Sequence, residues 1–112
     1  AAWNAALQRI AAPRPKTVSI FDDPAWFASL WGGRGPQGEP AYKTVVVGDL
    51  EVTHSLGNEP SNSMLADDHN GMVWNVLWAQ AMTKHLREVA QLPVTPITDA
   101  EVVRFVQAQT TN

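Results

Sequence analysis

The stretch that decides the fold is Tyr42-Lys-Thr-Val-Val-Val-Gly-Asp-Leu-Glu-Val-Thr-His-Ser-Leu56. Two runs rich in β-branched residues flank Gly48–Asp49, and such a pair between such runs is typical of a β-hairpin with a two-residue turn. A turn of this length sets the register, so that Val47 faces Leu50. Alternation then places six side chains on one face of the hairpin: Val45, Val47, Leu50, Val52, His54 and Leu56.

Three short elements are predicted before the hairpin. Apolar residues at helical spacing predict a helix over residues 3–11. Residues 17–21 alternate and include β-branched side chains, which predicts a strand. Asp23 can cap a second short helix over residues 24–31, and Gly32–Gly33 ends it in the manner usual for helix C-termini.

A long helix is predicted after the hairpin, over residues 72–91, with Asn70 or Asp68 as its N-cap. We expect its apolar stripe, and Trp74 and Trp78 above all, to cover the apolar face of the hairpin. The stripe comprises Trp74, Leu77, Trp78, Ala81, Met82, His85, Val89 and Leu92.

The last helix begins at Thr98-Asp-Ala-Glu101, which is a capping box. The predicted order is therefore α-β-α-β-β-α-α in a single domain over residues 1–112. The predicted strands are the hairpin over residues 42–56 and the strand over residues 17–21. A sheet this small needs a layer of helices to be stable, so we expect an α+β domain in which helices cover a small antiparallel sheet.

Composition narrows the possible function classes. Of the 112 residues 45% are hydrophobic and 17% are charged, five are tryptophan, and the net charge is −3, as in a soluble acidic protein. Basic residues are scattered, which argues against a nucleic-acid partner. The absence of cysteine excludes disulfides and thiolate chemistry, and no cofactor is expected. No apolar run approaches the roughly 20 residues of a membrane span, and we expect no signal peptide.

Few charges and many tryptophans favour a chain that works in contact with another protein. The second short helix carries Trp26, Phe27 and Trp31 on so few turns that they are either sandwiched or serve as anchors for a partner. Arg34 lies in the glycine- and proline-rich loop 32–41, and because arginine is favoured at interfaces we expect it to be a fourth anchor for the partner. The first hypothesis is therefore a non-catalytic interaction or assembly module that binds another protein chain or itself. A subunit of a phage or secretion particle, a small adaptor and an inhibitor all fit.

A second hypothesis places a polar site at the open end of the hairpin, where two long loops begin. Its candidates are His54, Asp67, Asp68 and His69, whose atoms suit a metal ion or the acid–base pair of a small hydrolase. Their spacing matches no metal or hydrolase motif, and Asp67–Gly71 is typical of a turn and helix cap. No catalytic residue is assigned, and the sequence favours a protein that is not an enzyme.

A third hypothesis is a carrier of a small apolar ligand. Trp74, Trp78 and His85 share the apolar stripe of the long helix and would line a pocket against the sheet. The simpler interpretation of His85 is a neutral core histidine that makes one hydrogen bond.

Overall fold

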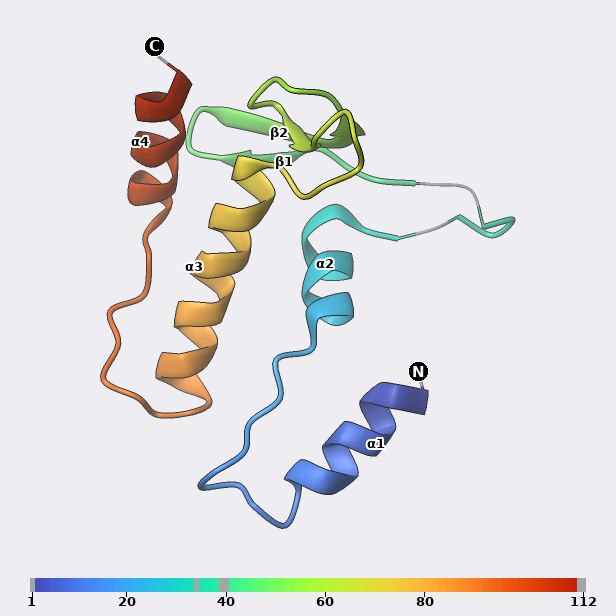
Figure 1. The fold of residues 1–112 in the computed structure, drawn as a ribbon, viewed down its shortest axis with the longest axis vertical. Coiled ribbons are helices and arrows are strands. Elements are labelled where there is room, and N and C mark those ends of the chain that lie inside the picture. Colours follow the sequence, from blue (N-terminus) through green and yellow to red (C-terminus); the bar gives the residue numbers. More distant parts are fainter. Residues whose placement is uncertain (1, 34, 39–40, 111–112) are drawn as a thin grey trace.

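The computed structural model describes residues 2–33, 35–38 and 41–110, and within these ranges it contains four helices and a three-stranded sheet (Figure 1). The α+β class predicted from the sequence is confirmed. None of the helices in these ranges is long and apolar enough to cross a membrane. The elements are α1 (Ala2–Ala11), α2 (Asp23–Trp31), β1 (Val45–Val47), β2 (Leu50–Leu56), β3 (Asn62–Met64), α3 (Met72–Glu88) and α4 (Asp99–Thr110).

The hairpin forms in the predicted register. Strands β1 and β2 are antiparallel, with Val47 opposite Leu50 and Val45 opposite Val52. Gly48 has a φ of 61°, a left-handed conformation that glycine adopts without steric cost. The turn residues and the alternation of buried and exposed valines in β1 therefore both support the predicted register.

The predicted strand over residues 17–21 is wrong, and the third strand comes from the second loop instead. Strand β3 pairs with β2 in parallel, so the sheet is mixed rather than antiparallel. Residues 17–21 run alongside α3, where Ser19 bonds His85 and Phe21 packs edge-on against Trp78. Because these side chains pack on a helix, the segment has no strand partner despite its β-branched residues.

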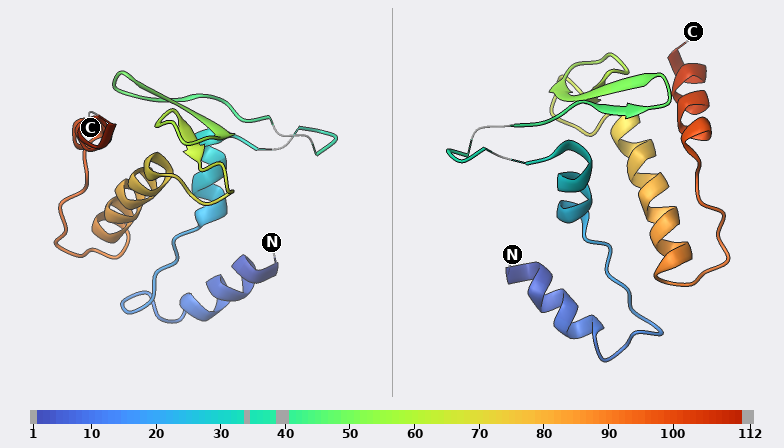
Figure 2. Two further views of the ribbon diagram at one scale, coloured as in Figure 1. Left: turned by 45° about the horizontal axis from the view of Figure 1, so that its top comes forward. Right: turned by 180° about the vertical axis from the view of Figure 1, so that it is seen from behind.

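The core lies where the sheet meets the first turns of α3, the end of α2 and one face of α4. Val73 and Leu77 are the α3 residues buried in this core. Trp74 and Trp78, which the sequence predicted to cover the hairpin, are not among its buried residues. Helix α3 runs away from the sheet, so only its first turns reach it (Figures 1 and 2). The buried cluster comprises Trp31, Val45, Val47, Val52, Val73, Leu77, Val102 and Val106.

The helix caps were predicted with mixed success. The capping box of α4 forms, since the Glu101 carboxylate accepts from the Thr98 amide at 2.9 Å and the Thr98 hydroxyl accepts from the Glu101 amide at 3.2 Å. Helix α2 is capped by Asp22 rather than Asp23. Helix α3 follows Gly71 without a side-chain cap, since the two predicted caps lie elsewhere: Asn70 bridges to Met64, and Asp68 occupies a turn with a φ of 70°.

Candidate interaction surface

The apolar stripe of α1 faces solvent. Trp3, Leu7 and Ile10 lie at positions i, i+4 and i+7, on one face of the helix. Trp3 is 80% exposed, Ile10 is 58% exposed and Leu7 is also exposed. A soluble helix normally buries such a stripe. These three residues, called the α1 face below, therefore form an apolar surface that no described part of the chain covers.

A different side of α1 attaches the helix to the rest of the molecule. The Asn4 amide donates to the Asp22 carboxylate at 3.1 Å, and Ala11 is buried. At 100° per residue both lie roughly a quarter-turn from the α1 face. A cavity of about 350 Å³, lined in part by Ala11 and by Val89 of the turn after α3, lies beside this contact. Helix α1 lies apart from the sheet and from α4 in every view (Figures 1 and 2).

The predicted anchors of α2 turn inward. Trp31 has no exposed surface, so the expectation that it anchors a partner is wrong. Trp26 and Phe27 are half-buried: Trp26 stacks edge-on against Trp74, and Phe27 packs edge-on against His54. Helix α2 is thus sandwiched. The fourth predicted anchor, Arg34, lies outside the described residues.

His54 belongs to this aromatic cluster rather than to a polar site. Its Nδ1 atom lies 2.7 Å from the Ser63 hydroxyl, and the ring of Tyr42 packs edge-on against it. Burial lowers the pKa of His54 below 6.5. Ser63 is fully buried in β3, so its hydroxyl has no face open to a substrate. The pair links β2 to β3.

The remaining candidates of the predicted polar site lie on the surface. Nδ1 of the exposed His69 lies 3.1 Å from the exposed carboxylate of Asp67, and hydrogen bonds from His69 lower the pKa of Asp67. Asp68 is exposed in the same turn. Within the part of the chain that the structure describes, no three His, Cys, Asp or Glu side chains are grouped as metal ligands would be. The structure therefore does not gather His54 and this turn into one site.

Trp74, Trp78 and His85 contact the segment that precedes and begins α2. Trp78 donates from Nε1 to the Asp23 carboxylate at 2.8 Å, and His85 Nε2 lies 3.1 Å from the Ser19 hydroxyl. Phe21 packs edge-on against the rings of both. These side chains hold α3 to residues 19–26. The side chains that were predicted to line a ligand pocket therefore pack against this segment of the chain.

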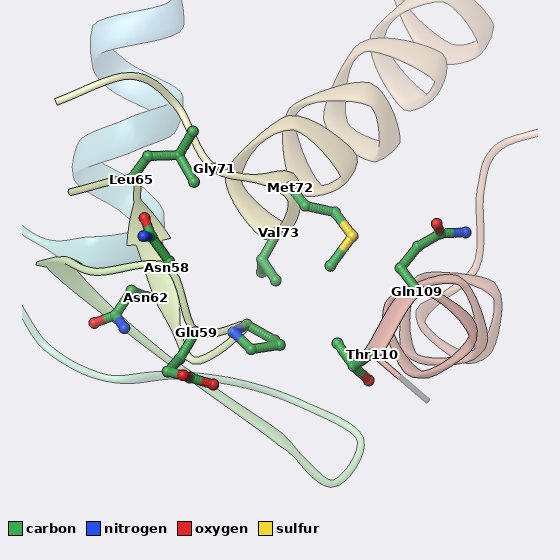
Figure 3. A pocket seen from close by; sticks show the side chains of 10 residues that line it. Asn58, Glu59, Asn62, Leu65, Gly71, Met72, Val73, Gln109 and Thr110 are labelled. Carbon is green, nitrogen blue, oxygen red and sulfur yellow. The ribbon is translucent and has the colours of Figure 1, made fainter. Parts of the chain in front are cut away.

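A polar cavity of about 340 Å³ lies between the start of α3, the end of α4 and the loop before β3 (Figure 3). Its two asparagine side chains are already engaged: Asn58 accepts from the Ala66 amide at 3.2 Å, and Asn62 accepts from the Ser55 hydroxyl at 2.7 Å. Glu59 is the charged group in its lining. Among the residues that the structure describes, the cavity lining therefore offers one carboxylate and no paired acid and base.

An open apolar groove between α3 and α4 is a further feature that sequence reasoning missed. Its volume is about 530 Å³, and its lining includes Phe105, which is 46% exposed. The full lining is Val76, Ile97, Glu101, Arg104, Phe105 and Ala108. The apolar residues of the α1 face and of the groove can be recognised in the sequence by their spacing, but whether they are exposed depends on how the helices pack.

Comparisons with protein-family models, with curated proteins and with solved structures gave no match. The surfaces described above are therefore the basis for any functional conclusion.

The half-buried imidazole of His54 predicts a pH dependence of stability. Because burial lowers the pKa of His54 in the folded chain, the unfolded chain takes up the proton first as the pH falls below 6.5. The contribution of the neutral ring is complete above pH 6.5 and declines below it. We expect the Tm to fall by a few degrees between pH 7 and pH 5.5, and His54→Gln to flatten that slope. An unchanged slope in the variant would contradict this assignment.

Proposed function

We propose that this chain is a non-catalytic interaction and assembly subunit that binds a protein through the α1 face. The observation that carries the proposal is the exposure of Trp3, Leu7 and Ile10 on one side of a helix. Tryptophan is the residue type most enriched among interface hot spots, and an apolar centre with few charges distinguishes a protein-binding patch. The α1 face therefore replaces the α2 residues as the expected anchor.

The shape of the molecule supports this proposal. The radius of gyration is 15.9 Å, whereas a compact domain of this length measures about 13 Å. The chain measures 47 × 41 × 22 Å along its principal axes. A flat and open chain leaves a large share of its apolar side chains uncovered, which is typical of a subunit that completes its packing with a partner.

Photocrosslinking tests the proposal in cells that produce the chain. Leu7 is replaced by p-benzoylphenylalanine, and the control carries the same group in place of Ala5, which lies on the opposite side of α1. We expect irradiation to give a discrete protein adduct from position 7 and none from position 5. Adding Trp3→Glu to the position-7 chain should abolish the adduct.

The outcome separates the possibilities. An adduct from both positions, or one that survives Trp3→Glu, would show non-specific contact and contradict the proposal. No adduct from position 7 would contradict it as well. The mass of a specific adduct identifies the partner as a second copy of the chain or as another protein.

A further inference from the structure

We propose that the partner of the α1 face is a second copy of this chain, whose groove between α3 and α4 receives it. This inference rests on the proposed function and names its partner. The groove is open and largely apolar, with Phe105 on its α4 side and Val76 on its α3 side. A helix that lays its apolar face into a hydrophobic groove is a recurring mode of protein recognition.

The two surfaces match in length. On α4 the groove extends from Glu101 to Ala108, and on α1 the apolar face extends from Trp3 to Ile10. Each covers seven residue steps, or about 10 Å of helix. With the two helices antiparallel, the largest side chain of the α1 face, Trp3, comes to lie beside the small Ala108.

Charge selects this antiparallel direction. Arg14 donates to the Ile10 carbonyl at 2.8 Å, which holds its guanidinium at the C-terminal end of the α1 face. Glu101 lies at the matching end of the groove, where hydrogen bonds from Thr98 lower its pKa and keep it ionised. The antiparallel arrangement brings Arg14 and Glu101 together and the parallel one separates them, whereas Arg104 lies near the middle of the groove in either direction.

The distribution of charge along the chain also favours a second copy. Residues 1–20 contain three basic residues and no acidic residue, whereas residues 21–112 contain eleven acidic and five basic residues. A basic N-terminal segment and an acidic body attract each other when they belong to different copies.

The chain exposes more surface than a compact monomer of its size. The chain exposes 7630 Å², and a compact monomer of 12.2 kDa exposes about 6,100 Å². The excess of roughly 1,500 Å² lies within the roughly 1,000–2,500 Å² that each chain buries in an obligate dimer. The α1 helix lies on the other side of α3 from α4 (Figures 1 and 2), so the groove of another copy is the one it can enter without rearranging the fold.

Light scattering coupled to size exclusion tests this pairing on the purified chain. We expect a mass of about twice 12.2 kDa for the wild type. Trp3→Glu and Phe105→Glu should each weaken association by about thirtyfold or more, the effect of losing a hot spot. Ala5→Glu and Ala100→Glu add the same charge outside the α1 face and the groove lining, and should leave the mass unchanged.

Mixing the two disabled variants gives the decisive measurement. The Trp3→Glu chain keeps an intact groove and the Phe105→Glu chain keeps an intact α1 face, so together they restore one contact. We expect the mixture to associate although neither variant does so alone. Circular dichroism and Tm identify any variant that fails to fold, and Leu7→Glu then replaces Trp3→Glu, or Ala108→Glu replaces Phe105→Glu.

Any of the following results would contradict the pairing of the α1 face with the groove. A wild-type chain that stays at 12.2 kDa at every concentration excludes self-association. A dimer that is insensitive to both folded variants uses another surface, and a mixture that fails to associate excludes the pairing of α1 with the groove. A monomer whose position-7 crosslink captures a different protein refutes this inference and leaves the proposed function standing.

Discussion

Trp31→Ala is expected to lower the free energy of unfolding by about 3–5 kcal/mol, because the largest side chain of the core would leave a cavity among packed valines. That loss is a large part of the roughly 5–15 kcal/mol that stabilises a typical domain. We expect the Tm to fall by more than about 10 °C in a thermal melt followed by circular dichroism.

Trp3→Ala is the matched control, because it removes the same side chain from a position that is 80% exposed. Its effect on the unfolding of the monomer should stay within about 0.5 kcal/mol. The stabilities of both variants are measured at a protein concentration low enough to keep the chain monomeric. Equal losses in the two variants would show that Trp31 is not the centre of the core.

Trp31→Phe refines the same prediction. The Nε1 atom of Trp31 is buried and lacks a hydrogen-bond partner among the described residues. Leaving a buried donor unpaired costs about 1–3 kcal/mol, and phenylalanine removes that donor while keeping an aromatic ring. We therefore expect Trp31→Phe to cost less than half as much as Trp31→Ala. A loss of stability equal to that of Trp31→Ala would contradict the assignment of an unpaired buried donor.

Gly71→Ala is expected to lower the free energy of unfolding by about 1–3 kcal/mol through overpacking. A Cβ atom at Gly71 would lie 2.8 Å from the carbonyl oxygen of Ser63 and 3.2 Å from its carbon, and backbone atoms cannot rotate away as a side chain can. The Gly71 amide also donates to this oxygen at 2.8 Å, so a shift would weaken the bond between the start of α3 and β3. Chemical denaturation with urea measures the loss.

Gly33→Ala is the control for this substitution, because a Cβ at Gly33 meets no described atom within 4 Å. We expect its stability to be unchanged or slightly raised, since alanine restricts the unfolded chain. A Gly71→Ala variant as stable as Gly33→Ala would mean that α3 and β3 can separate without cost. Loss of amide protection at Gly71 and Met64 in hydrogen exchange would locate the damage.

Local chemistry determined the elements that the sequence predicted correctly. The turn at Gly48–Asp49 sets the register of β1 and β2 because the side-chain period of a strand is two. The capping box at Thr98 starts α4 because it satisfies helix amides from within the same turn. Each depends on residues within a few positions of one another, so no knowledge of packing was needed.

The sequence-based predictions were wrong where contacts between residues far apart in the sequence decide the structure. Residues 17–21 have the composition of a strand, yet their side chains pack on α3. Asn62–Met64 lacks the β-branched residues that signal a strand, yet its backbone pairs with β2, with the Thr53 amide donating to the Ser61 carbonyl at 2.7 Å. Asp67 and His69 pair with each other rather than with His54.

By itself the sequence determined the hairpin and its register, the α+β class and the positions of the four helices, because turns, caps and periodicity act over a few residues. Only the tertiary structure decided which aromatic side chains are covered, since burial depends on what lies opposite. Trp31 and Trp3 both lie on short apolar helices, and the first is fully buried while the second is 80% exposed. The proposed site follows from that difference: Trp31 packs in the core with residues of the sheet, α3 and α4, whereas nothing described in the chain covers the apolar face of α1.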